Sequence, residues 1–148
     1  MKKLKNYLGP RTVRTFDIEA ISIPIVYNKY GYHDTNGLIF VLRKDSSKIQ
    51  KMAKKHLEMS PPQHYKEVQP LVIRANVSYE ICINLYNKLN RRVSLHVKGL
   101  KYDVQTSDGA NVGYNRDITT DNVAHYTYYA EKEGIYFFSD MQIQEAMN

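Results

Sequence analysis

Val93-Ser94-Leu95-His96-Val97-Lys98-Gly99-Leu100 is the stretch that decides the fold. Side chains at positions i and i+2 lie on the same face of a strand, so His96 and Lys98 share one face. A His-x-His strand presents two imidazoles on one side, and this spacing suits metal binding. Here Lys98 holds the second place, and a protonated ammonium group cannot bind a metal. The stretch therefore predicts a strand with one candidate metal ligand, His96.

The residues around this stretch alternate between strand-forming and turn-forming segments. Runs of β-branched and aromatic residues are typical of strands, whereas clusters of Gly, Asp and Asn are typical of turns. Their alternation predicts an antiparallel sandwich. Pro24 lies inside the first strand, so we expect an edge or a bulge there. Residues 30–36 and 100–123 are predicted as loops. Strands are predicted at 16–27, 38–42, 71–77, 80–87, 92–97, 125–130 and 135–139.

One helix is predicted, from Asp45 to Leu57. Asp45 or Ser46 can cap its start, and Ser60-Pro61-Pro62 ends it. Its apolar residues follow the spacing i, i+3, i+4, i+7, i+8, which forms a single stripe along a helix. The residues of this stripe are Ile49, Met52, Ala53, His56 and Leu57. We expect this helix to be inserted at one edge of the sandwich.

The chain has the size and composition of one soluble domain. Its 148 residues are 43% hydrophobic and 24% charged, which suits a single buried core. We divide it into a basic, flexible N-terminal segment, 1–15, and a single domain, 16–148. No apolar run approaches the roughly 20 residues that cross a bilayer, and the basic start lacks the apolar core of a signal peptide. We therefore expect a cytoplasmic protein without a transmembrane segment. The single cysteine, Cys82, is expected to be a buried, inert thiol.

The net charge of +6 comes from basic residues that gather in the first fourteen positions, at 48–55 and at 91–101. A surface of this sign attracts anionic partners. No nucleic-acid-binding motif accompanies the charge, so we expect no nucleic-acid partner, and a solvated surface is the simpler interpretation. A non-catalytic binding or scaffold module with a basic surface stays open as an alternative function.

Three segments stand out by their order along the chain. They are Gln69-Pro70-Leu71-Val72-Ile73-Arg74-Ala75-Asn76-Val77, the loop from Ser94 to Gly109, and Glu133-Gly134-Ile135-Tyr136-Phe137-Phe138-Ser139-Asp140-Met141. Together they resemble the N-terminal cupredoxin domain of bacterial multicopper oxidases. Residues 17–64 resemble a subgroup of large, multi-domain, bacillus-type copper oxidases. The resemblance implies an all-β, Greek-key, cupredoxin-like β-sandwich with one inserted edge helix at about Asp45 to Leu57. It also implies copper as the cofactor.

The resemblance places most of the family's copper ligands on residues that bind copper poorly. The family's His-x-His pair falls on His96 and Lys98, and a second pair of histidines falls on Ser139 and Met141. Serine is not a usual copper ligand, and a lone thioether suits only soft Cu(I). Cys82 has no histidine after it at the spacing of a type 1 copper site. His96 is therefore the one metal ligand that we predict, and we assign no catalytic residue.

The resemblance further implies a domain that is cut short. Family members continue after the segment 139–141 into a further strand and the next domain, whereas this chain runs to Asn148. A frameshift after Met141 would produce such a fragment, and the gene sequence tests this hypothesis. Without a closing strand one sheet edge is open. We expect self-association, the N-terminal segment or the tail to cover that edge.

The remaining polar candidates have simpler roles than catalysis or metal binding. Asp103 and Asp108 flank His96 and can bind a cation, but turns and backbone caps explain them more simply. No Ser-His-Asp spacing, phosphate loop or zinc motif is present. The histidines that we assign to turns, helix packing, linkers or strand ends are His33 (beside Asp34), His56, His64 and His125.

Together these features predict the first domain of a multicopper oxidase without oxidase activity of its own. At most it binds copper weakly, through His96. Whether the chain is an enzyme is left open. An active small oxidase that builds copper sites between copies requires histidines that this chain lacks. The partner that we expect is a second copy, bound through an open sheet edge.

Overall fold

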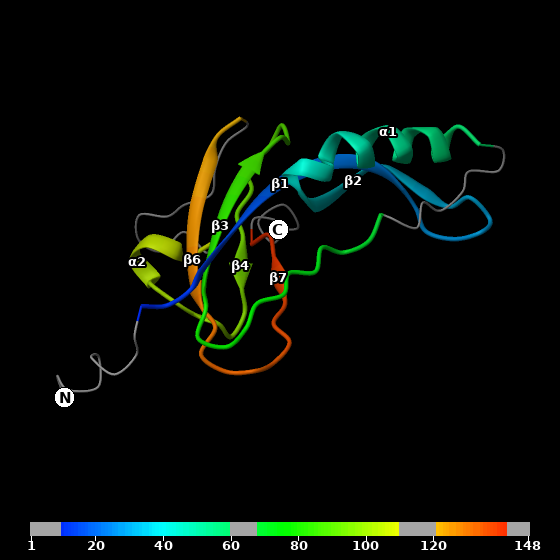
Figure 1. Ribbon diagram of the computed structural model, residues 1–148. Coiled ribbons are helices and arrows are strands. Elements are labelled where there is room, and N and C mark those ends of the chain that lie inside the picture. The colour runs from blue at the N-terminus through cyan, green and yellow to red at the C-terminus, as the bar shows by residue number, and fades with distance from the viewer. Residues whose placement is uncertain (1–9, 60–67, 110–120, 142–148) are drawn as a thin grey trace.

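The fold has two β layers and one helix of 12 residues (Figure 1). The computed structural model describes residues 10–59, 68–109 and 121–141. Within these residues, five strands form a larger sheet in the order β2-β1-β3-β6-β5, and two short strands form a smaller one. The strands of the larger sheet are β1 (Val13–Val26), β2 (His33–Leu42), β3 (Glu80–Asn87), β5 (Lys101–Tyr102) and β6 (Val123–Tyr129). Those of the smaller sheet are β4 (His96–Val97) and β7 (Phe138–Ser139).

The central strand, β3, has the bounds that the sequence predicts. Its side chains alternate between half-buried and buried, and Ile81, Ile83 and Leu85 point into the core. On the neighbouring strand β6, Tyr126 and Tyr128 are buried as well. These side chains pack against apolar residues of the smaller layer in one cluster. Burial of this apolar surface holds the two layers together.

β1 begins earlier than predicted, and it pairs with β3 in the parallel direction, which the sequence did not predict. Residues 13–15, which we assign to the N-terminal segment from sequence, belong to the strand and pair with the first residues of β3, from Glu80. The pairing of β1 with β3 is parallel, so the expectation of a wholly antiparallel sandwich is wrong at this contact. Residues 1–9 of the N-terminal segment lie outside the described residues.

β2 begins at His33, inside the stretch that we predict as a loop. That part of the loop prediction is wrong. His33 lies opposite Val26 of β1, and this backbone pairing overrides the low strand propensity of Gly, Asp and Asn. The register of the β1–β2 pair shifts on passing Pro24, where an irregularity was expected. Proline has no N–H to donate to the ladder, which explains the interruption.

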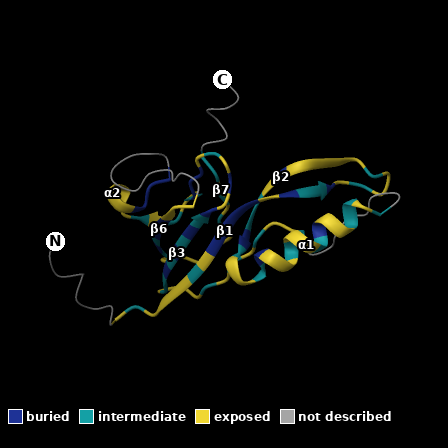
Figure 2. Ribbon diagram, turned by 90° about the horizontal axis from the view of Figure 1, so that it is seen from above, coloured by how far each residue is buried: buried dark blue, intermediate teal, exposed yellow. Residues whose placement is uncertain are grey.

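The predicted helix is confirmed as α1 (Ser46–Leu57), and a short 3-10 turn, η1 (Arg43–Asp45), precedes it. Asp45 is at the N-cap position, although its side chain makes no capping hydrogen bond. The helix covers β1 and β2 where these two strands extend beyond the sandwich (Figures 1 and 2). The buried residues at this contact are Ile21, Ile23, Val41 and Ala53. No helix in the described part of the chain is long and apolar enough to cross a membrane.

The smaller layer contains less regular strand than predicted. Of the expected strands 92–97 and 135–139, the parts that pair with each other are β4 and β7, with His96 opposite Ser139, and Val93 forms an isolated β-bridge. Residues 71–77 were also expected to form a strand. They pair with no other strand in the described ranges, although the side chains of residues 71–76 alternate between half-buried and exposed, as those of a strand do.

Candidate functional site

His96 lies on β4, which two buried tyrosines of β6 hold in place. The Tyr126 hydroxyl accepts a hydrogen bond from the backbone N of Leu95 (3.3 Å). The Tyr128 hydroxyl accepts one from the backbone N of Val97 (3.4 Å) and donates one to the carbonyl O of Leu95 (3.3 Å). These bonds span the two layers of the sandwich. The backbone on both sides of His96 is therefore positioned from the larger sheet.

The His96 imidazole lies between a carboxylate and a phenol. The Oδ1 atom of Asp108 is 3.6 Å from Nδ1 of His96, and the Asp108 side chain is 6% exposed. This distance allows an ion pair when the imidazole is protonated but is too long for a hydrogen bond. The Tyr102 ring meets the imidazole edge-on, with ring centroids 5.4 Å apart. Burial first, and the Asp108 carboxylate second, raise the pKa of Tyr102 above its ordinary value.

A short helix, α2 (Val104–Ser107), shapes the loop that brings Asp108 to this position. Asp103 caps the helix by accepting a hydrogen bond from the backbone N of the residue two positions on (2.8 Å). The Ser107 hydroxyl accepts one from a backbone N–H of β6 (3.0 Å). Gly109 then passes so close to the backbone beside β4 that a β-carbon would collide with it. The expected capping role fits Asp103, whereas Asp108 is the neighbour of His96.

The three positions where the family has histidine ligands, and this chain has other residues, lie in surroundings that differ from one another. Ser139 lies directly opposite His96 in the β4–β7 ladder, and residues opposite each other project to the same face. Lys98 is exposed, and its backbone N donates to the segment that leads into β7. Met141 is half-buried, and its backbone N donates to the Ser94 hydroxyl (3.3 Å). Ser139 is thus the position from which a second ligand would meet His96.

The donor set around His96 does not form a closed metal site. Among residues 10–59, 68–109 and 121–141, no group of three or more His, Cys, Asp or Glu side chains comes together to hold a metal ion. Copper sites in proteins combine several imidazole, thiolate or thioether ligands. One imidazole with one carboxylate at 3.6 Å falls short of such a set. The copper that the resemblance implies therefore does not fit the described residues of this chain.

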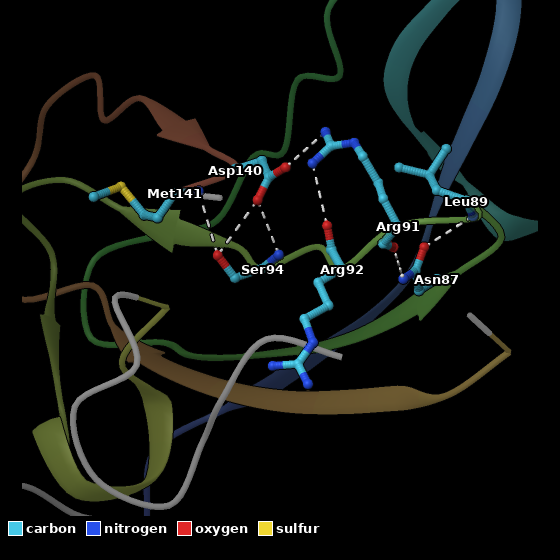
Figure 3. A network of polar contacts seen from close by, with 7 residues as sticks. All are labelled: Asn87, Leu89, Arg91, Arg92, Ser94, Asp140 and Met141. Atoms are coloured by element: carbon cyan, nitrogen blue, oxygen red, sulfur yellow. Dashed lines mark hydrogen bonds and ion pairs between the residues drawn. The ribbon is translucent and has the colours of Figure 1, made fainter. Parts of the chain in front are cut away.

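A second polar centre, which no sequence pattern marks, joins the end of β7 to the segment before β4 (Figure 3). The Asp140 side chain is 5% exposed, and its Oδ2 atom lies 2.9 Å from Nη2 of Arg91. Its Oδ1 atom accepts a hydrogen bond from the backbone N of Ser94 (3.0 Å). The Asn87 amide extends the network by donating to the carbonyl O of Arg91 (2.7 Å) and accepting from the backbone N of Leu89 (2.8 Å). The network holds β7 beside β4.

The other candidate residues make local contacts. The Nδ1 atom of His33 lies 2.8 Å from a loop carbonyl O, and that of His125 lies 2.6 Å from Oδ1 of Asn84. Both histidines are exposed. Cys82 is half-buried on the outer side of β3, so the prediction of a fully buried thiol is wrong. His64 lies outside the described residues.

High pH is expected to weaken the fold through Tyr128. Burial raises the pKa of this phenol above its ordinary value of 10.0, because the charged form would lose its hydration. Above pH 10 the unfolded chain loses this proton while the folded chain keeps it, so stability falls as the pH rises. Urea denaturation at a pH below 10.0 and at a pH above it measures the free energy of unfolding under both conditions. The decrease between the two should be smaller in Tyr128→Phe than in wild type. An equal loss in both proteins would contradict this role.

Comparison with known proteins relates this geometry to copper proteins. The family model described as multicopper oxidase matches residues 67–148, more than half of the chain. A multi-copper oxidase from Pseudomonas thermotolerans is similar over 88% of this chain and 25% of its own, with 10% identity and a TM-score of 0.57. A copper nitrite reductase from Nitrosomonas europaea is similar over 87% of this chain and 35% of its own, with 14% identity and a TM-score of 0.58. No curated protein matches the chain.

The two solved structures confirm the predicted fold, an all-β, Greek-key sandwich of the cupredoxin type. The chain spans 25% and 35% of the lengths of these two solved proteins. The narrower expectation of a bacillus-type subgroup stays a prediction. Because the family model covers more than half of its residues, and its fold is that of known copper proteins, this chain belongs to the multicopper oxidase family.

Proposed function

We propose that this chain is a cupredoxin domain that contributes framework, and no complete copper site of its own, to a multicopper oxidase. The observation that carries the proposal is the β4–β7 ladder, in which His96 faces Ser139 and not a second imidazole. A type 1 copper site needs two histidines and a cysteine. Cys82 lies on β3 with Glu80 as its polar neighbour, at 3.9 Å, and therefore supports no such site. The isolated chain then has no oxidase turnover.

Copper binding by this chain alone is expected to be weak and to depend on His96. Titration with copper, measured by calorimetry, should show weak binding to wild type and still weaker binding to His96→Ala. Lys98→Ala is the matched control: its exposed ammonium group is no ligand, so the variant should bind copper at least as well as wild type. Tight stoichiometric copper in both wild type and His96→Ala would overturn the role of His96. Turnover of a phenolic substrate by the wild-type chain would overturn its inactivity.

A second candidate function, binding of an anionic partner, rests on helix α1. Its four lysines are exposed, and no acidic residue lies between them: Lys48, Lys51, Lys54 and Lys55. A cationic surface of this kind binds polyanions in a salt-dependent manner. Replacement of all four by glutamine should abolish retention on heparin if this function holds. Replacement of the exposed residues Lys98, Lys101 and Lys132, which lie outside α1, is the control.

A further inference from the structure

Residues 69–76 form one side of the smaller layer but lack the backbone pairing of a strand. Leu71, Ile73 and Ala75 pack against the core, and the side chains between them are exposed. In the described part of the chain, the carbonyl O of Asn76 accepts one hydrogen bond from the following turn, and no backbone bond joins this run to a strand. Such an edge offers a row of N–H and C=O groups to another chain.

An apolar groove of about 1570 Å³ lies between this run and residues 132–138. The half-buried rings of Tyr136 and Phe138 line it from the side of β7. Three large apolar side chains of the same two segments are exposed, by 71%, 88% and 79%: Val72, Ile135 and Phe137. A monomeric protein seldom exposes apolar groups together in this way, and such patches mark interaction sites.

We propose that a second copy of this chain covers the incomplete layer, with the 69–76 runs of the two copies paired about a two-fold axis. Two identical edges can pair antiparallel about a two-fold axis. Each contact from a residue of the first copy to a residue of the second is then repeated from the second copy to the first. The pairing supplies strand partners for backbone groups of residues 71–75 that have none among the described residues. It also brings Val72 and Phe137 of each copy out of water, which stabilises the dimer. This pairing involves no copper ligand.

The distribution of charge favours a second copy at this face. A net charge of +6 opposes association of identical chains wherever the basic residues gather. Residues 69–76 and 132–138 hold only two basic residues, Arg74 and Lys132, and one acidic residue, Glu133. Like charges on the two copies therefore repel little here, and Glu133 of one copy can approach a basic residue of the other. The lysine-rich helix α1 lies on the extension of β1 and β2 instead (Figure 1).

Sedimentation equilibrium of the full chain tests the proposal. Wild type should form a dimer, and Phe137→Lys should weaken it at least about tenfold, because a charge then replaces an apolar contact. Phe137 is 79% exposed, so its replacement should leave the stability of the monomer unchanged. Tyr30→Lys is the matched control, since Tyr30 is 73% exposed in the turn between β1 and β2 and should not affect the dimer.

Hydrogen exchange separates the possible occupants of the edge. Amides of residues 71–75 should exchange more slowly as the protein concentration rises, and Phe137→Lys should remove this dependence. A wild-type monomer at every concentration would overturn the proposal. So would slow exchange of these amides that does not depend on concentration, since the chain would then cover its own edge. A dimer that Phe137→Lys leaves unchanged would place the interface elsewhere and would also overturn it.

Discussion

Replacement of Asp140 by alanine is expected to lower the free energy of unfolding by about 3 kcal/mol, because it removes a buried carboxylate from its partners. The change leaves Arg91, whose side chain is 32% exposed, without the carboxylate oxygen that now lies 2.9 Å from its Nη2 atom. It also leaves the backbone N–H of Ser94 without its acceptor. Both losses act on the junction between β7 and the segment before β4. Urea denaturation of the two proteins measures the difference.

Lys88→Ala provides the control for this prediction. Lys88 also forms an ion pair at 2.9 Å, with Asp121, but the side chains are 44% and 73% exposed. Exposed pairs contribute at most about 1 kcal/mol, because water and salt screen them. The two ion pairs thus have the same length but differ in burial, and Asp140 in addition accepts the hydrogen bond from the backbone N of Ser94. Equal losses for Asp140→Ala and Lys88→Ala would mean that the Asp140 network does not hold the smaller layer.

Ser139→His is expected to increase copper affinity about tenfold or more, which corresponds to about 1.4 kcal/mol. Ser139 faces His96 directly across the β4–β7 ladder, so the new imidazole would project to the same face. Two imidazoles at this spacing can bind one metal ion together. Ser139 is exposed, so the larger side chain has room without disturbing the core. Copper titration of the variant beside wild type measures the gain.

Two further variants show whether the gain in copper affinity depends on the pairing of residues 96 and 139 in the β4–β7 ladder. Ile135→His introduces an imidazole on the same segment at a position that is 88% exposed and does not face His96. It should bind copper no better than wild type. The double variant Ser139→His with His96→Ala should lose the gain. If the double variant keeps the affinity of Ser139→His, the two residues do not share a metal ion.

Two elements were predictable from local sequence signals. Strand β3 alternates only weakly in sequence but lies between two turn signals, and α1 repeats its apolar residues with the period of a helix. Both patterns follow from local geometry and need no knowledge of distant residues. The run 69–76 shows the limit of this reasoning. The side chains of residues 71–76 alternate as those of the predicted strand 71–77 would, but a strand also requires a backbone partner, and alternation does not reveal whether one is present.

The candidate site was only partly predictable. His96 could be identified because the residues around it form a recognisable stretch, and Asp103 and Asp108 could be noted beside it in the sequence. That Asp108 approaches the imidazole while Asp103 caps α2 depends on the path of the loop between them. Asp140 could not be identified, because its partner Arg91 lies 49 positions away and no motif links the two.

The sequence by itself determined which segments can be strand or helix, which side chains are apolar enough for the core, and that His96 lacks histidine partners at the expected positions. The tertiary structure alone decided that β1 pairs parallel with β3, that Ser139 faces His96, and that residues 69–76 have no strand partner within the described ranges. The reason is physical. Periodicity and propensity act over a few neighbouring residues, whereas backbone pairing and buried charge pairs join residues far apart in the chain, and only the folded molecule brings these together.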